Sequence, residues 1–116
     1  MAVHHLGIMD KPPQKSEIYE TFEPEKYNCI SVSDDYIEPI LSLMCNIDFF
    51  YNTLNIKEKG LNYCGITLIP PSSSEKMLSV IENNENLKNL TELLKKAVNE
   101  NKYVIHFGIW FINNKA

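Results

Sequence analysis

The sequence contains no arginine, because all eleven of its basic residues are lysines. Arginine is the usual bidentate partner of phosphate groups and guanine edges, and domains that bind nucleic acids normally carry a net positive face. This chain instead has 15 acidic residues and a formal net charge of −4 at pH 7. The composition argues against a nucleic-acid partner and favours a basic protein, since opposite potentials steer two proteins together.

Glycine and cysteine are also scarce. None of the four glycines belongs to a phosphate-binding loop or a G-x-S-x-G nucleophile elbow. The three cysteines, Cys29, Cys45 and Cys64, lack the C-x-x-C spacing of a redox pair or a zinc site. An odd cysteine count with no apparent secretory leader predicts reduced thiols in a cytoplasmic protein. No stretch approaches the roughly 18 consecutive apolar residues that a membrane-spanning helix needs, so no membrane partner is predicted.

What the chain does contain is enough apolar material, 44% of 116 residues, for one domain with one core. Runs of apolar residues bounded by turn signals predict strands at 2–9, 27–32, 61–69 and 103–112. Helical spacing of apolar residues predicts a helix at about 35–53, a short one after 72–74 and a third after 83–84. We therefore expect a single α+β domain over 1–116, with three helices packed against one mixed sheet of about four strands. The two helices between the last two strands allow a parallel crossover.

The histidines are the first candidates for chemistry. His4 and His5 are adjacent in a predicted strand, so their side chains point to opposite faces of the sheet. One of them could approach His106 across neighbouring strands, but two ligands are fewer than zinc requires. Cys64 is in phase with apolar neighbours, the pattern of a buried and inert thiol. We predict no catalytic residue, no metal and no cofactor. The alternative is a small metal- or ligand-binding module, or an enzyme, with a site around His4, His5, Cys64 and His106.

The most unusual feature is a segment rich in both acids and aromatic residues. Between residues 17 and 38 there are seven carboxylates and one lysine, with tyrosine and phenylalanine among them. A solvated face with a capped helix start is the simpler interpretation. The functional interpretation is a docking surface, because tyrosines supply rigid contact area and carboxylates supply charge complementarity. That interpretation predicts a surface for a cationic protein formed by Glu17, Tyr19, Glu20, Glu23, Asp34, Asp35, Tyr36 and Glu38.

Four blocks of sequence carry a family resemblance: MAVHHLGI at 1–8, CISVSDD at 29–35 with IEP at 37–39, GLNYCGITLIPP at 60–71, and NKYVIHFGI at 101–109. Together they resemble a group of short bacterial proteins, the immunity proteins paired with polymorphic toxins, including those of contact-dependent growth inhibition. The resemblance implies a cytoplasmic antidote that binds the C-terminal toxin domain of an effector. It assigns no contact to an individual residue. We expect the toxin to be a nuclease, whose cleft is cationic, and the free antidote to be a monomer or weak dimer.

Overall fold

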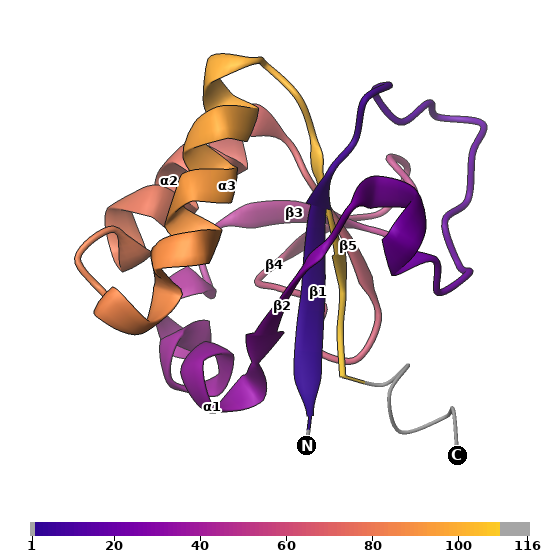
Figure 1. The fold of residues 1–116 in the computed structure, drawn as a ribbon. Helices are drawn as coiled ribbons and strands as arrows, with labels where there is room; N and C mark the ends of the chain where they lie inside the picture. The colour runs from indigo at the N-terminus through magenta and orange to yellow at the C-terminus, as the bar shows by residue number, and fades with distance from the viewer. Residues whose placement is uncertain (1, 110–116) are drawn as a thin grey trace.

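The computed structural model describes residues 2–109 of the chain. Its strands form one six-stranded sheet in the order β2-β1-β6-β5-β3-β4, and each neighbouring pair is antiparallel (Figure 1). The strands are β1 (Val3–Ile8), β2 (Ile30–Ser33), β3 (Asp48–Tyr51), β4 (Lys57–Lys59), β5 (Ile66–Ile69) and β6 (Val104–Phe107).

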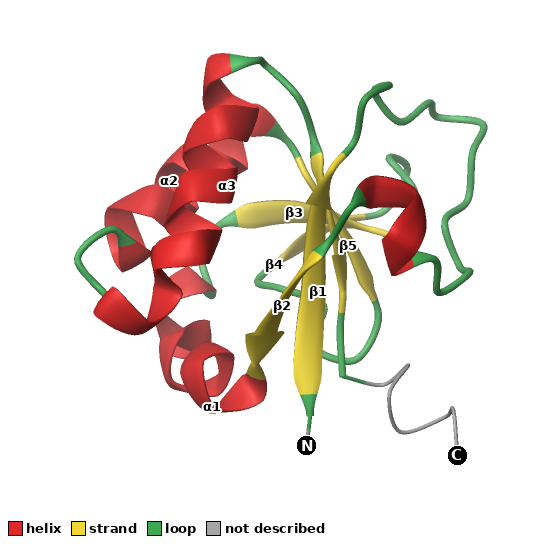
Figure 2. Ribbon diagram, viewed as in Figure 1, coloured by secondary structure: helices red, strands yellow, loops and turns green. Residues whose placement is uncertain are grey.

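Helices cover one face of this sheet and an extended segment covers the other (Figure 2). The α-helices are α1 (Asp34–Ile37), α2 (Pro71–Ile81) and α3 (Lys88–Asn99). The 3-10 helices are η1 (Pro24–Tyr27), η2 (Glu38–Met44) and η3 (Glu85–Leu87). Residues 10–29, which include η1, form what we call the covering segment. Within the described part of the chain, no helix is long and apolar enough to cross a membrane.

The hydrophobic core therefore has two parts, one on each face of the sheet. On the helix face, Leu6 and Val104 pack against residues of α2 and α3, such as Leu90. On the opposite face, Ile105 and Phe107 pack against side chains of the covering segment. Because successive residues of a strand point to opposite faces, β5 and β6 are buried on both sides, as the apolar pattern of the third and fourth predicted strands indicates. Residues 110–112 of the fourth predicted strand lie outside the described residues.

The α+β class and the three helices packed on a sheet are confirmed. The expected mixed sheet of about four strands was wrong, because the sheet has six strands and every neighbouring pair is antiparallel. The predicted helix at 35–53 is three elements, α1, η2 and strand β3. The apolar residues Ile37, Ile40 and Met44 are buried as expected, because i, i+3 spacing also fits a 3-10 helix. The run Asp48–Tyr51 is aromatic and favours a strand, and the left-handed Asn52 (φ +63°) follows it.

Strands β2 and β5 begin later than the predicted strands at 27–32 and 61–69. Two further differences concern the edge strand and the chain direction. Lys57–Lys59 has no apolar pattern that predicts a strand, yet it pairs with β3 as the edge strand β4. Its charged composition discourages further strand pairing. A parallel crossover was also wrong, because β5 and β6 are antiparallel neighbours. Helices α2 and α3 pack together as a pair, which returns the chain to the sheet in the opposite direction.

Candidate functional site

The eight predicted docking residues lie in two groups on opposite faces of the sheet. Glu17, Tyr19, Glu20 and Glu23, the loop group, belong to the covering segment, which packs on the face away from the helices. Asp34, Asp35, Tyr36 and Glu38, the α1 group, begin where β2 ends, and the buried Ile37 beside them packs into the core on the helix face. Strand β2 separates the two groups along the chain, so one continuous run of acids in the sequence becomes two surfaces.

Tyr19 in the loop group is committed to internal contacts. Its hydroxyl donates a hydrogen bond to Glu17 Oε1 at 2.9 Å. Partial burial, together with that bond, raises the pKa of the Tyr19 hydroxyl. Its backbone N–H donates to the Asn52 carbonyl at 2.7 Å, and the Asn52 amide donates back to the Tyr19 carbonyl at 2.8 Å. Tyr19 therefore fastens the covering segment to the turn after β3.

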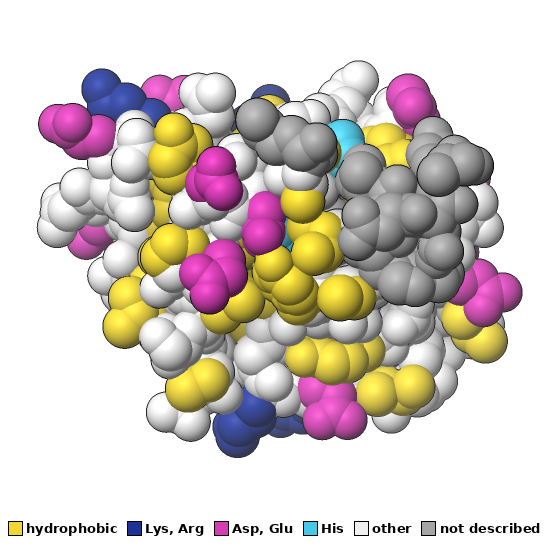
Figure 3. All heavy atoms as spheres, turned by 90° about the horizontal axis from the view of Figure 1, so that it is seen from below, with side chains coloured by type: hydrophobic (Ala, Val, Ile, Leu, Met, Phe, Trp, Pro, Cys, Tyr) yellow, Lys and Arg dark blue, Asp and Glu magenta, His cyan; other side chains and the backbone are white. Residues whose placement is uncertain are grey.

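The α1 group is more open to solvent. Ser33 caps α1, accepting a hydrogen bond from the Asp35 backbone N–H at 3.2 Å, and the acids of the first turn suit the helix dipole. Asp35 and Glu38 are exposed, and Tyr36 is 42% exposed. Leu43 on η2 is 60% exposed. Figure 3, which views the molecule from below Figure 1, shows acidic side chains gathered beside hydrophobic ones. We refer to Asp35, Tyr36, Glu38 and Leu43 as the α1 surface.

Asp34 differs from the rest of its group because its carboxylate is engaged on both oxygens. Oδ1 lies 2.9 Å from His4 Nε2, and Oδ2 accepts a hydrogen bond of 2.5 Å from the Tyr63 hydroxyl. Burial alone would raise the pKa of Asp34, but the bonds from Tyr63 and His4 lower it further than burial raises it. The same bond to Asp34, with burial, raises the pKa of Tyr63 to about 12. Asp34 is thus an ionised acceptor and Tyr63 a neutral donor.

These contacts continue into the sheet as what we call the histidine chain. His4 Nδ1 lies 2.9 Å from His106 Nε2, and His106 Nδ1 lies 3.0 Å from Thr67 Oγ1. The Asn62 backbone N–H donates to the same Thr67 oxygen at 3.0 Å. His4, His106 and Thr67 are fully buried. The chain therefore runs Thr67, His106, His4, Asp34, Tyr63.

The register of the sheet explains this meeting. His106 lies opposite Leu6 on β1 and opposite Thr67 on β5. His4 is two residues from Leu6 on β1, so its side chain is on the same face of the sheet as those of His106 and Thr67. His4 reaches His106 diagonally, a separation that long side chains can span. Alternation in the sequence indicated that His4 or His5 could approach His106. Nothing in the sequence pointed to Thr67 or Tyr63, and the two interpretations of Asp34 were an acidic docking surface and a capped helix start.

Of the four residues in the alternative site, the structure brings two together. His5 points to the opposite face from His4, as predicted, and packs edge-on to the Phe22 ring with centroids 5.3 Å apart. Cys64 is exposed, so the prediction of a buried thiol was wrong. Residues 62–65 form a turn that breaks the phase before β5 begins. Among residues 2–109, no group of three or more histidine, cysteine, aspartate or glutamate side chains could hold a metal ion.

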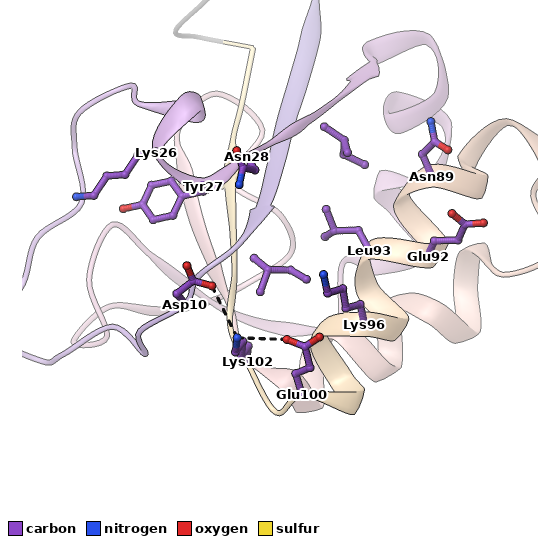
Figure 4. Close-up of a pocket in the computed structure, with 12 residues that line it drawn as sticks. Asp10, Lys26, Tyr27, Asn28, Asn89, Glu92, Leu93, Lys96, Glu100 and Lys102 are labelled. Atoms are coloured by element: carbon purple, nitrogen blue, oxygen red, sulfur yellow. Dashed lines mark ion pairs between the residues drawn. The ribbon is translucent and has the colours of Figure 1, made fainter.

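A groove of about 460 Å³ lies between the start of β2 and α3 (Figure 4). Three aliphatic side chains line it, and its charged residues are balanced, with three lysines and three acids. Lys102 joins two of those acids, lying 3.2 Å from Glu100 and 3.7 Å from Asp10. This balance gives the groove no preference for an anion or a cation.

Fold and site together define an α+β domain with a fully antiparallel sheet, a buried histidine chain and an acidic surface on α1. No protein-family model, no curated protein and no solved structure matches the chain.

One consequence can be tested by Tyr63→Phe, which removes the hydroxyl but keeps the ring. We expect it to lower the free energy of unfolding at pH 7 by about 1 kcal/mol, because Asp34 loses a donor. An Asp34 with a lowered folded-state pKa adds stability that is present above its unfolded value of about 4 and is lost as pH falls through the folded value. The variant should therefore lose less stability than the wild type below pH 4. Urea unfolding at several pH values measures both effects.

The control for that measurement is Tyr36→Phe, which makes the same chemical change at a tyrosine that is 42% exposed. Its stability should stay within about 0.5 kcal/mol of the wild type. Equal stabilities of the two variants at every pH would show that the Tyr63–Asp34 bond contributes nothing.

Proposed function

We propose that this protein is a non-catalytic cytoplasmic binding protein that neutralises a cationic protein domain, as an immunity protein does. Its partner would be the C-terminal toxin domain of a contact-dependent growth inhibition effector or a related one. The α1 surface carries this proposal, because it combines exposed carboxylates, an exposed tyrosine and an exposed leucine. The free thiols of all three cysteines suit a reducing compartment.

The charge distribution supports a basic partner. No lysine occurs between Lys26 and Lys57, so the residues that flank α1 in the sequence contribute no lysine charge against its acids. Carboxylates at such a site complement lysines and arginines that hold phosphates in a nuclease cleft. Facing charges of opposite sign accelerate association and suppress wrong partners. We expect Asp35 and Glu38 to occupy the cationic positions of the toxin.

The apolar residues of the α1 surface supply the other requirement of a tight interface. Interface energy is concentrated in a few residues, and tyrosine is among the commonest of them. Tyr36 and Leu43 would fill apolar pockets next to the cationic positions. Asp34 would act indirectly, since its carboxylate is bound to His4 and Tyr63. The loop group, on the opposite face, would add to the long-range potential rather than to the contact.

We expect the gene immediately upstream to encode a large effector with a C-terminal toxin domain, and the test begins with co-expression of this chain and that domain. Growth should be rescued from that toxin and not from an unrelated one. The double variant Asp35→Lys/Glu38→Lys should then bind the toxin at least about 100-fold more weakly, about 3 kcal/mol, with a slower on-rate. Surface plasmon resonance at two salt concentrations measures both.

The loop group offers a matched control, because Glu20→Lys/Glu23→Lys changes the net charge by the same amount. It should reduce the on-rate modestly and leave the off-rate unchanged. If the loop variant loses affinity and the α1 variant does not, the contact lies on the covering segment. Unchanged affinity in both variants would refute charge-complementary binding.

A further inference from the structure

The histidine chain joins parts of the fold that are far apart in sequence. His4 belongs to β1, Asp34 to α1, Tyr63 to the turn before β5, Thr67 to β5 and His106 to β6. Through it, α1 is held to the two central strands by side chains as well as by its apolar contacts. Buried polar groups of this kind are stable only when every member is satisfied.

With both histidines neutral, one arrangement of protons satisfies every hydrogen bond of the chain. Ionised Asp34 can only accept, so His4 donates from Nε2–H, and its Nδ1 must accept. His106 therefore donates from Nε2–H to His4, and its Nδ1 accepts the hydroxyl proton of Thr67. Both histidines are then neutral and carry their proton on Nε2.

We propose that the histidine chain is an acid-sensitive latch, which holds α1 on the sheet at neutral pH and releases it in mild acid. This property belongs to the chain itself and does not depend on whether the α1 surface binds a partner.

The geometry explains why a further proton is disruptive. His4 can accept it only on Nδ1, where it would point at the Nε2–H of His106. The conflict is relieved if His106 moves its own proton to Nδ1 and accepts from His4, but Nδ1–H then faces Thr67, whose hydroxyl proton loses its acceptor. The first route leaves two buried ring N–H donors facing each other, and the second takes from the Thr67 hydroxyl the acceptor it has at neutral pH. Either loss is unfavourable for a buried donor.

The electrostatic setting acts in the same direction. Burial lowers the pKa of His4, and this outweighs the raising effect of Asp34. Burial lowers the pKa of His106 well below its ordinary value, and the neighbouring His4 and His5 lower it further. Besides the two histidines and Asp34, the histidine chain contains one more ionisable group, Tyr63. The nearby Cys64 and Glu38 help to raise the pKa of Tyr63.

The sign of the pH dependence follows from these directions. Because the folded-state pKa values lie below the unfolded value of about 6.5, the stability from the neutral histidines is complete above pH 6.5. It is lost as pH falls from there towards the folded values. Each histidine held neutral lowers the ratio of folded to unfolded protein roughly tenfold per pH unit in that window.

The experiment uses the full chain without a partner. Between pH 7.5 and 5.0 the folded-to-unfolded ratio of the wild type should fall by at most roughly 30-fold for each of the two histidines, with the larger share from His106. Urea unfolding measures it in the wild type, in His4→Gln/His106→Gln and in His5→Gln. The double variant should lose most of this dependence, whereas His5→Gln, altered at the neighbouring residue on the other face, should keep it. Equal pH dependence in all three proteins would overturn the proposal.

Two measurements on the wild type keep the test decisive if the double variant does not fold. Nitrogen-15 NMR of the side chains should show His4 and His106 as neutral Nε2–H tautomers at pH 6.5. Hydrogen exchange, corrected for its intrinsic pH dependence, should show that amides at 34–38 lose protection at pH 5.0 before those of α3. Titration of either histidine at or above pH 6.5, or simultaneous loss in α1 and α3, would overturn the latch.

Discussion

Gly108→Ala should lower the free energy of unfolding by about 3 kcal/mol, at the upper end of the range for a small overpacking change. A methyl group at Gly108 would lie 2.2 Å from the Tyr63 carbonyl oxygen and 2.7 Å from its carbonyl carbon. Both atoms are backbone, so no side-chain rotation relieves the clash. The Gly108 N–H also donates to the Gly65 carbonyl at 2.8 Å, which ties the end of β6 to the turn 62–65.

The effect should spread to the histidine chain, because the turn that must move carries Tyr63. We expect the Tyr63–Asp34 bond to weaken and the protection of α1 amides to fall with the stability. Gly60→Ala is the control, since a methyl group there would meet only the Cα of Cys45 at an ordinary 3.7 Å. Its loss, about 1 kcal/mol, comes from the positive φ of +84° alone. If urea unfolding shows that Gly108→Ala loses no more stability than Gly60→Ala, the turn 62–65 moves aside without cost and the prediction is wrong.

Periodicity predicted which residues are buried better than it predicted their elements. Leu90, Leu94 and Ala97 form the buried stripe of α3, as their spacing indicated. The similar spacing at 37–47 predicted the buried residues correctly but predicted one long helix where the chain forms α1, η2 and a turn. Over a few residues these elements place side chains on one face at nearly the same spacing, so the pattern does not distinguish them. Strand β4 has no apolar pattern at all. This strand forms because it pairs with β3, and nothing in the local sequence indicates that pairing.

The candidate site shows the same limit at the level of side chains. A count of acids along the chain found the α1 surface but merged it with the loop group, because density in sequence ignores the strand between them. Asp34 was predicted to face a partner, whereas the structure binds its carboxylate to His4 and Tyr63. These contacts span 30 and 29 positions of sequence. They depend on sheet register and on where a turn ends, which the sequence left open.

The second large effect is expected from Phe107→Ala, on the face opposite the histidine chain. Phe107 is fully buried, with its ring edge-on to Phe22 at 5.6 Å and tilted against Tyr27 at 6.2 Å between centroids. Its removal takes away burial and leaves a cavity, so the free energy of unfolding should fall by about 4 kcal/mol. Phe22 and Tyr27 belong to the covering segment, which should lose its hold on the sheet.

Limited proteolysis separates this local release from general destabilisation. Trypsin can cut the covering segment after Lys15 and Lys26, and it can cut α3 after Lys95 and Lys96. Release of the segment predicts early cleavage at the first two lysines in Phe107→Ala while α3 stays intact. Ile18→Ala, at a residue 67% exposed on the same segment, should change neither stability nor cleavage order. Simultaneous cleavage at all four lysines would mean that the two faces of the sheet unfold as one unit. The covering segment would then be part of the cooperative core, and the loop group would be held as rigidly as the α1 surface.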